Sequence, residues 1–165
     1  PHAVTLAVAN SCISVSLEKM IIRCAQIKAA IVSKDEREDH SRLVLNFGHT
    51  LGHAIEAATH YQQFTHGQAI GHGMILATQI SNCLGKIQVT EAATIQQDVA
   101  RLSPLPSLGK LRWKSIHHHM RSDKKIIDHR LKFVLPCRIG AVEIVQDTPP
   151  KLVENIVRAY LKSSS

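Results

Sequence analysis

Apolar side chains recur every three or four residues along most of the chain, which is the spacing of helices with one buried face. A helix capped by Ser16 is predicted through about Ile31, followed by a charged connector at 34–39. Five more helices are predicted in chain order, with these approximate bounds: 42–61, 66–84, 90–102, around 117–119, and a terminal helix from about 150. Gly85 is the expected C-cap of the helix over 66–84.

The pattern changes in the stretch 131–145, where β-branched residues partly alternate with polar ones. Two short runs, 131–135 and 138–145, are separated by Pro136 and predict a small two-stranded unit. The whole pattern therefore predicts a mainly α fold of about six helices and one small β element. With 165 residues, we expect a single domain over 1–165. Because the chain begins with Pro1 and not with methionine, we expect it to be processed or a piece of a longer protein.

The predicted helix over 42–61 has an unusual polar face. At about 100° per residue, four polar side chains fall within an arc of roughly 60°, and two more extend the stripe. They are Arg42, Asn46, His49 and His53, followed by Glu56 and His60. Gly48 and Gly52 weaken a helix by up to about 1 kcal/mol each relative to alanine. Their presence predicts a close backbone approach to a ligand or to a neighbouring element.

Histidines on this face make a metal site the leading chemical hypothesis. His49 and His53, at i and i+4, can both present a ring nitrogen to one metal ion, and His66 follows after a short polar stretch. Chance spacing remains an alternative, because the chain holds eleven histidines. The run His117–His119 is predicted to face solvent, since adjacent helical residues point in different directions.

The formal charge of +7 points to anionic partners, but Lys and Arg are spread along the chain and not interleaved with aromatic residues. This favours a phosphate- or carboxylate-bearing small substrate over nucleic acid. The four separated cysteines predict reduced thiols in a cytoplasmic protein, and no signal peptide or membrane-spanning run is recognised. No glycine-rich nucleotide loop occurs either, so we expect no nucleotide site in this chain.

Several short strings resemble one known family. The most specific is LNFGHTLGHAIE at 45–56, followed by His66-Gly67. Supporting strings are Ile27-Lys28-Ala29, the acidic 35–38 segment, Gly73-Met74 and Asp123-Lys124-Lys125. From about Leu17 to the end of the β unit, the chain resembles the C-terminal helical domain of the 3-dehydroquinate synthases. That family implies NAD- and metal-dependent cyclisation of 3-deoxy-D-arabino-heptulosonate 7-phosphate to 3-dehydroquinate in the shikimate pathway, with Zn²⁺ or another divalent ion such as Co²⁺.

The resemblance also implies roles for individual residues. His49 and His66 correspond to metal ligands, and His53 to an active-site histidine that handles a proton or a hydrogen bond. Arg42 and Asn46 correspond to residues that bind substrate and take part in catalysis. A further substrate contact is implied for Lys28, and another for one of the two lysines Lys124 and Lys125.

The resemblance covers only the last half of such an enzyme. The NAD-binding N-terminal α/β domain and the glutamate that serves as third metal ligand are expected outside this chain, which alone should be inactive and hold metal weakly. A homodimer is implied, with no membrane or nucleic-acid partner. Gln68 and His72 depart from the family pattern, which usually has glutamate and an aliphatic residue there. Two other functions stay open: another sugar-phosphate cyclase of aminocyclitol or valiolone type, and a non-catalytic basic helical binding module.

Overall fold

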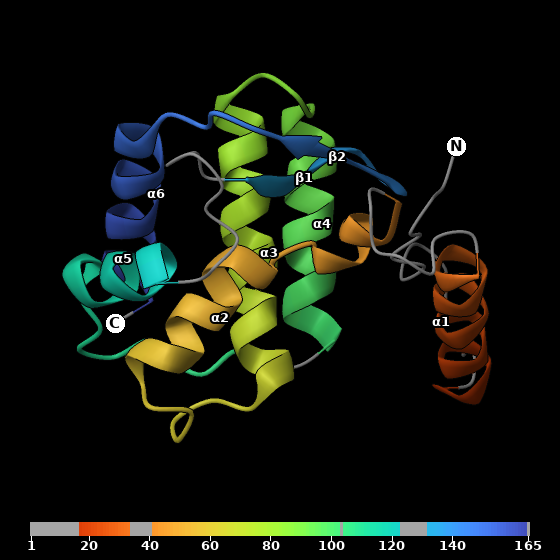
Figure 1. Cartoon of the computed structure of the whole chain (residues 1–165), viewed down its shortest axis with the longest axis horizontal. Coiled ribbons are helices and arrows are strands. Elements are labelled where there is room, and N and C mark those ends of the chain that lie inside the picture. The colour runs from red at the N-terminus through yellow and green to blue at the C-terminus, as the bar shows by residue number, and fades with distance from the viewer. Residues whose placement is uncertain (1–16, 34–40, 103, 123–131, 165) are drawn as a thin grey trace.

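The computed structural model describes residues 17–33, 41–102, 104–122 and 132–164. Within them the fold is mainly α with one two-stranded sheet, as predicted (Figure 1). The helices are α1 (Leu17–Val32), the 3-10 helix η1 (Ser41–Asn46), α2 (His49–Ala58), α3 (His66–Cys83), α4 (Val89–Leu102), α5 (Trp113–Ser122) and α6 (Pro150–Ser163). The strands are β1 (Phe133–Arg138) and β2 (Ala141–Val145).

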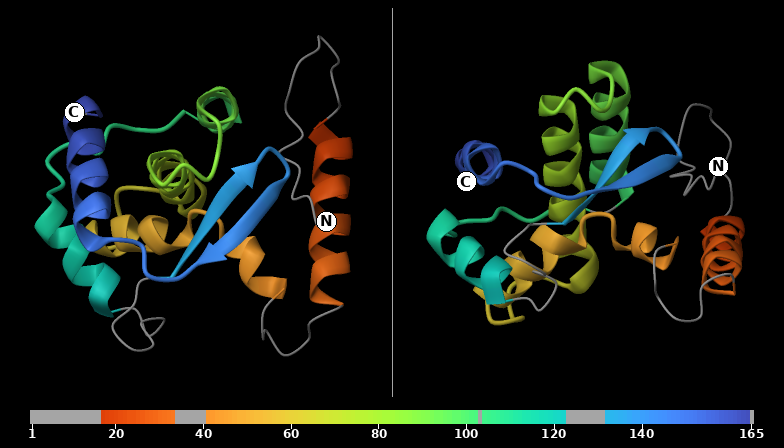
Figure 2. Two further views of the ribbon diagram at one scale, coloured as in Figure 1. Left: turned by 90° about the horizontal axis from the view of Figure 1, so that it is seen from above. Right: turned by 45° about the horizontal axis from the view of Figure 1, so that its top comes forward.

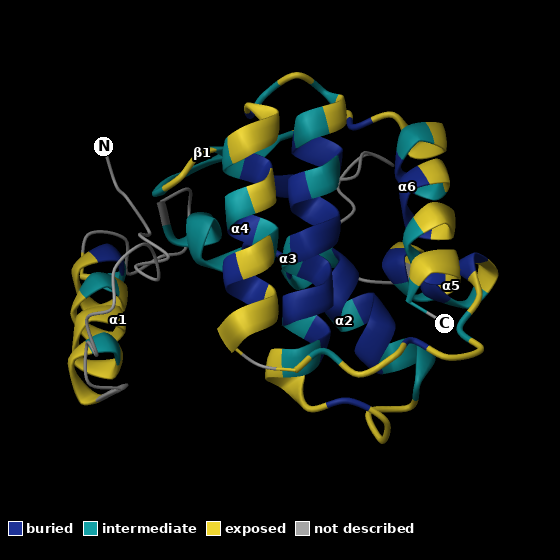
Figure 3. Cartoon of the chain, turned by 180° about the vertical axis from the view of Figure 1, so that it is seen from behind, coloured by how far each residue is buried: buried dark blue, intermediate teal, exposed yellow. Residues whose placement is uncertain are grey.

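Helix α3 forms the centre of the molecule. It packs against α2, α4, α6 and β1, and Figure 3 shows it as the most continuously buried helix. Ala69 and Ile80 of α3 are fully buried, and α5 covers α2 from the other side. The hairpin of β1 and β2 lies between α3 and η1 (Figure 2). Helices α2 and α3 therefore both contribute to the buried core.

Both ends of α3 are fixed by local hydrogen bonds. At the start, the Gln68 N–H donates to Thr65 Oγ1 (3.4 Å) and the Thr65 N–H donates to Gln68 Oε1 (2.9 Å), which is a capping box. At the end, Gly85 has φ +68° and its N–H donates to the Asn82 carbonyl, while the Lys86 N–H donates to the Ser81 carbonyl. The C-cap of α3 is Leu84, one residue before the predicted Gly85, whose left-handed backbone follows the helix end. At the helix start, the side chain of Gln68 takes the place that glutamate usually has in the family.

The prediction of one continuous helix over 42–61 is wrong. η1 ends at Asn46, and α2 begins only at His49. Gly48 between them has φ +82°, a left-handed conformation that a helix interior does not tolerate. Arg42 and Asn46 therefore come from a separate short helix and do not share a helical face with His49 and His53.

The strand prediction needs a smaller correction, because Pro136 lies inside β1 and not between the strands. It pairs with Val142, and the register shifts between Pro136 and Arg138. A proline is accommodated here because the sheet has only two strands and the irregularity follows at once. The Pro136 carbonyl accepts a hydrogen bond from the buried Ser81 hydroxyl, which ties the hairpin to α3.

Helix α1 is present as predicted, but part of its apolar side is exposed, although Ile31 is buried. Ile21 is 58% and Ile22 48% exposed, and Lys28 is exposed as well. The helix lies beside η1, apart from the other helices (Figures 1 and 2). Its predicted cap, Ser16, lies outside the described residues. Among the described helices, none has both the length and the apolar character needed to cross a bilayer.

Candidate metal centre and substrate pocket

Three histidines converge where α2 meets the start of α3. His49 and His53 lie one turn apart on α2, and His66 is the first residue of α3. Each offers a ring nitrogen, and these nitrogens lie within 4.8 Å of one another. Ring centroids are 5.2 Å apart for His49 and His53, 5.6 Å for His49 and His66, and 5.7 Å for His53 and His66. These three residues are called the histidine cluster below.

The spacing of the histidine cluster suits one small cation. Zinc binds imidazole nitrogen at about 2.0–2.1 Å, so two ligands of a tetrahedral ion lie roughly 3.4 Å apart. Side-chain shifts of about 1 Å would bring the cluster nitrogens to that separation. Spacing predicted the pair His49 and His53, whereas the family resemblance implied His49 and His66. The structure brings all three together.

Close packing of α2 on α3 creates this convergence. A Cβ atom added to Gly73 would collide with the Gly48 carbonyl oxygen and lie 2.7 Å from the Gly52 nitrogen. A Cβ atom on Gly52 would lie 3.0 Å from the Ile70 Cα. The close approach predicted from Gly48 and Gly52 is thus present, and its partner is the backbone of α3.

A buried carboxylate orients His66. Both carboxylate oxygens of Glu56 lie close to His66 Nδ1, at 3.2 Å for Oε1 and 3.1 Å for Oε2. Glu56 is only 7% exposed, while the His66 side chain is 59% exposed. Because a carboxylate accepts and does not donate, the proton lies on Nδ1 and the lone pair of neutral His66 lies on Nε2.

His49 is oriented in a similar way by the backbone. Its Nδ1 lies 3.2 Å from the Phe47 carbonyl oxygen, which also only accepts, so neutral His49 carries its lone pair on Nε2. No hydrogen-bond partner of the His53 ring lies among the described residues. Among the described residues, acceptors therefore lie at Nδ1 of His49 and His66 but at neither ring nitrogen of His53.

A pocket of about 510 Å³ opens beside His53 and His66. Its walls come from α2, the loop after it, the start of α3, and α5. They are formed by Thr50, His53, Ala54, Glu56, Ala57, Tyr61, His66 and His119. Tyr61 is 70% exposed at this pocket, and its backbone is left-handed (φ +58°), with its N–H donating to the Glu56 carbonyl.

His119 in this pocket corrects the prediction that His117–His119 all face solvent. His119 is half-buried, His117 stacks on Trp113 with ring centroids 5.0 Å apart, and only His118 is exposed. The signal that sequence reasoning missed was the apolar spacing of Ile116 and Met120, both buried, which places His119 at the edge of the face that α5 turns toward α2.

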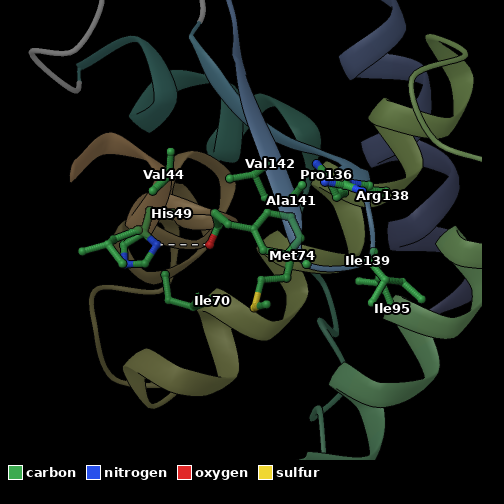
Figure 4. Close-up of a pocket in the computed structure, with 13 residues that line it drawn as sticks. Val44, His49, Ile70, Met74, Ile95, Pro136, Arg138, Ile139, Ala141 and Val142 are labelled. Atoms are coloured by element: carbon green, nitrogen blue, oxygen red, sulfur yellow. Dashed lines mark hydrogen bonds between the residues drawn. The ribbon is translucent and has the colours of Figure 1, made fainter. Parts of the chain in front are cut away.

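A second, mostly apolar pocket of about 200 Å³ adjoins His49 (Figure 4). Val44, Ile70, Met74 and Val142 are among the side chains around it. Figure 4 also shows the hydrogen bond from His49 Nδ1 to the Phe47 carbonyl on one side of this pocket. The histidine cluster thus lies between a polar pocket and an apolar one.

The remaining predicted site residues are less closely grouped. Arg42 and Asn46 are half-buried on η1, and Asn46 stands three residues before His49. Lys28 is exposed on α1, the helix that contacts η1. None of these three lines either pocket described above. Lys124 and Lys125 lie outside the described residues.

His72 of α3 is a buried histidine outside the cluster. Its Nε2–H donates to the Pro106 carbonyl (3.0 Å), and its Nδ1 accepts from the Tyr160 hydroxyl (2.8 Å). Burial lowers the pKa of His72, and the bond to Pro106 partly offsets this. The position that departs from the family pattern therefore holds a neutral histidine that joins α3 to α6. The described cysteines, Cys24, Cys83 and Cys137, are thiols without a disulfide, as expected.

Fold and cluster together define a helical domain with a candidate metal centre between two glycine-packed helices. The family described as 3-dehydroquinate synthase C-terminal matches residues 5–126, and the chain belongs to this family. Its relatives include 3-dehydroquinate synthases of Solibacter usitatus, 36% identical over 146 residues, and Shewanella halifaxensis, 38% identical over 143 residues. These matches cover 88% and 86% of this chain but only 41% and 40% of the relatives, so the chain spans about two fifths of their length.

Solved structures of other cyclases share the fold. A 2-deoxy-scyllo-inosose synthase complexed with carbaglucose-6-phosphate, NAD⁺ and Co²⁺ is 26% identical with a TM-score of 0.73, covering 87% of this chain and 41% of that one. A 2-epi-5-epi-valiolone synthase of Streptomyces hygroscopicus, with NAD⁺ and Zn²⁺ bound, shares the fold with a TM-score of 0.74 at 22% identity, covering 88% of this chain and 40% of that one. The predicted fold class and family are thereby confirmed.

Proposed function

We propose that this chain is the metal- and substrate-binding part of a 3-dehydroquinate synthase. The enzyme would convert 3-deoxy-D-arabino-heptulosonate 7-phosphate to 3-dehydroquinate with release of phosphate, as a carbon–oxygen lyase of the shikimate pathway. Similarity to relatives of that name supports this reaction. The observation that carries the proposal is that His49, His53 and His66 bring ring nitrogens within 4.8 Å of one another, with an acceptor at Nδ1 of His49 and of His66.

The residues present fit a divalent metal such as Zn²⁺ or Co²⁺. Imidazole nitrogens suit both ions, and an outer carboxylate such as Glu56 is the usual partner of a metal-binding histidine. His49 and His66 would supply two ligands, with a glutamate from the preceding part of the enzyme as the third. When bound, the metal would polarise and orient substrate hydroxyl oxygens, while NAD, held mainly by an N-terminal domain, would accept and return a hydride.

His53 is proposed to work on the substrate side of the centre. It lines the 510 Å³ pocket together with His119, and no described residue restricts its tautomer. A ring nitrogen placed in this way can hydrogen-bond a substrate hydroxyl and move its proton. Its neighbours on α2, Ala54 and Ala57, leave room in the pocket for a ligand.

Positive side chains are proposed to bind the anionic groups of the substrate. Arg42 suits a carboxylate or phosphate, because its planar guanidinium donates two parallel hydrogen bonds, and Asn46 suits a hydroxyl. Lys28 and one of Lys124 and Lys125 would add point charges. Because Lys28 lines neither pocket, its contact with substrate would require α1 to approach the cluster.

The chain over 1–165 would act as one domain of a larger, cytoplasmic and homodimeric enzyme. A test is to express residues 1–165 alone and also joined to an N-terminal half taken from the Shewanella halifaxensis relative. The joined protein should release phosphate from the heptulosonate phosphate and form 3-dehydroquinate, while the chain alone should not. A folded, metal-loaded joined protein that leaves this substrate unchanged would refute the proposed reaction.

A second candidate is another sugar-phosphate cyclase, favoured by the structural similarity to 2-deoxy-scyllo-inosose synthase. The same joined protein should be offered glucose 6-phosphate and sedoheptulose 7-phosphate, and turnover of either in preference to the heptulosonate phosphate would select this candidate. The non-catalytic binding module predicts RNA or DNA affinity that falls steeply with salt. Titration without salt-dependent binding removes it.

A further inference from the structure

We propose that Glu56 is a positioning residue, which fixes the tautomer of His66 and strengthens its bond to the metal. The inference rests on the proposed metal centre. Glu56 lies on α2 one turn after His53, with both carboxylate oxygens 3.1–3.2 Å from His66 Nδ1. The N–H thus points between the two oxygens, although the residues come from different helices.

The burial of Glu56 needs an explanation. A carboxylate that is 7% exposed has lost most of its water, which is unfavourable unless a partner compensates. No lysine or arginine pairs with Glu56 among the described residues, where its one ion-pair partner is His66. A neutral imidazole offers a single N–H donor. A cation on the opposite nitrogen would add the positive charge that this buried site lacks.

The two proposed ligands differ in their outer partner. His49 donates to the neutral carbonyl of Phe47, whereas His66 donates to a charged carboxylate. A negative charge at Nδ1 makes Nε2 a better electron donor and so a stronger ligand. Loss of the carboxylate should therefore weaken the bond of His66 to the metal while leaving His49 in place.

The backbone of Glu56 is held in place by hydrogen bonds at the end of α2. Its backbone carbonyl accepts hydrogen bonds from the N–H of Thr59 and of Tyr61 and from the Thr59 hydroxyl, which closes the end of α2. Since the carboxylate also lines the 510 Å³ pocket, it could contact the metal directly instead of acting through His66. The experiment has to separate these two roles.

The test compares residues 1–165 with the variants Glu56→Gln, Glu56→Ala and His66→Ala, and with the matched control Glu154→Gln. Glu56→Gln removes the charge but keeps an oxygen acceptor, whereas Glu56→Ala leaves no acceptor at His66 Nδ1. Glu154 is a carboxylate on α6 that pairs with Lys151 and Arg158, away from the histidine cluster. Co²⁺ is titrated by visible absorption, and Zn²⁺ affinity is taken from competition. The tautomers of His49 and His66 are read in the metal-free proteins by ¹⁵N NMR, and circular dichroism checks that each variant is folded.

The expected result is an affinity loss of about 10- to 100-fold in Glu56→Gln, the range typical for outer partners of metal-binding histidines. In Glu56→Ala, His66, and not His49, should lose its single Nδ1–H tautomer, and Glu154→Gln should match the parent protein within about twofold. Unchanged affinity in Glu56→Gln would overturn the inference. Lost affinity in Glu56→Ala with an unchanged His66 tautomer would also overturn it, since Glu56 would then be a direct ligand.

Failure of the metal centre itself would look different. In that case the parent protein would bind neither ion, and His66→Ala would change nothing in the titration. The tautomer measurement would still decide whether Glu56 holds His66, so the two claims fail separately.

Discussion

Replacing Gly73 by alanine is expected to push α2 away from α3. The new Cβ would collide with the Gly48 carbonyl and lie 2.7 Å from the Gly52 nitrogen, and these backbone atoms have no rotamer in which to escape. Overpacking typically costs about 1–3 kcal/mol, and a backbone clash belongs at the upper end. The higher helix propensity of alanine stabilises the helix by up to about 1 kcal/mol, so the free energy of unfolding should fall by roughly 2 kcal/mol.

The assay is thermal unfolding followed by circular dichroism. For a domain of this size, a loss of roughly 2 kcal/mol lowers Tm by about 4–8 °C. Gly67→Ala is a matched control on the same helix, because no atom lies within 4 Å of the Cβ it would add. That variant should keep or slightly raise Tm. A Gly73→Ala protein with the Tm of the parent would refute the claim that backbone contact between α2 and α3 builds the site.

Two further predictions concern stability. Burial lowers the pKa of His72 below its unfolded value of 6.5, so the unfolded chain binds more protons and stability falls as the pH drops from about 7 through the folded-state pKa. Urea unfolding between pH 7.5 and 5 should show a weaker pH dependence in His72→Leu than in the parent; an equal dependence would contradict a neutral, buried His72. Thr65→Ala removes the acceptor of the capping box at the start of α3 and should cost about 1 kcal/mol by the same measurement, whereas Thr65→Ser should restore most of it. No loss in Thr65→Ala would mean that the box is not formed in solution.

The spacing of apolar and polar residues along the chain predicted most of the helices and two of the three clustered histidines. The apolar repeat located α1, α3, α4 and α6 closely, because each helix keeps an apolar stripe along its length. It also placed His49 and His53 on one face, since both lie within a single regular turn of α2. Glycines at 48 and 52 correctly indicated a close backbone approach, although Gly48 lies between two helices and not within one.

The rest depended on contacts between distant segments. The break at Gly48 could not be predicted, because the apolar repeat continues through it. The reason for the break is the close contact of Gly48 with α3, which the repeat does not record. The pairing of Glu56 with His66 needs the crossing of α2 and α3, and His119 reaches the pocket from another helix. An amphipathic repeat likewise predicts α1 but not what covers its stripe, because the repeat records only that one face is apolar.

Metal affinity of single histidine variants tests the central claim most directly. Co²⁺ and Zn²⁺ should be titrated into His49→Ala, His66→Ala and His53→Ala, with the exposed His118→Ala as control. Because a third ligand is expected from outside this chain, the absolute affinity will be low. The test therefore compares the metal affinity of each variant with that of the parent protein. Losing a direct ligand should cost more than the 10- to 100-fold typical of an outer partner, so His49→Ala and His66→Ala should each lose at least about 100-fold, while His53→Ala stays within about tenfold. Equal losses in His53→Ala and His66→Ala would contradict the division of the cluster into two metal ligands and one substrate-side histidine.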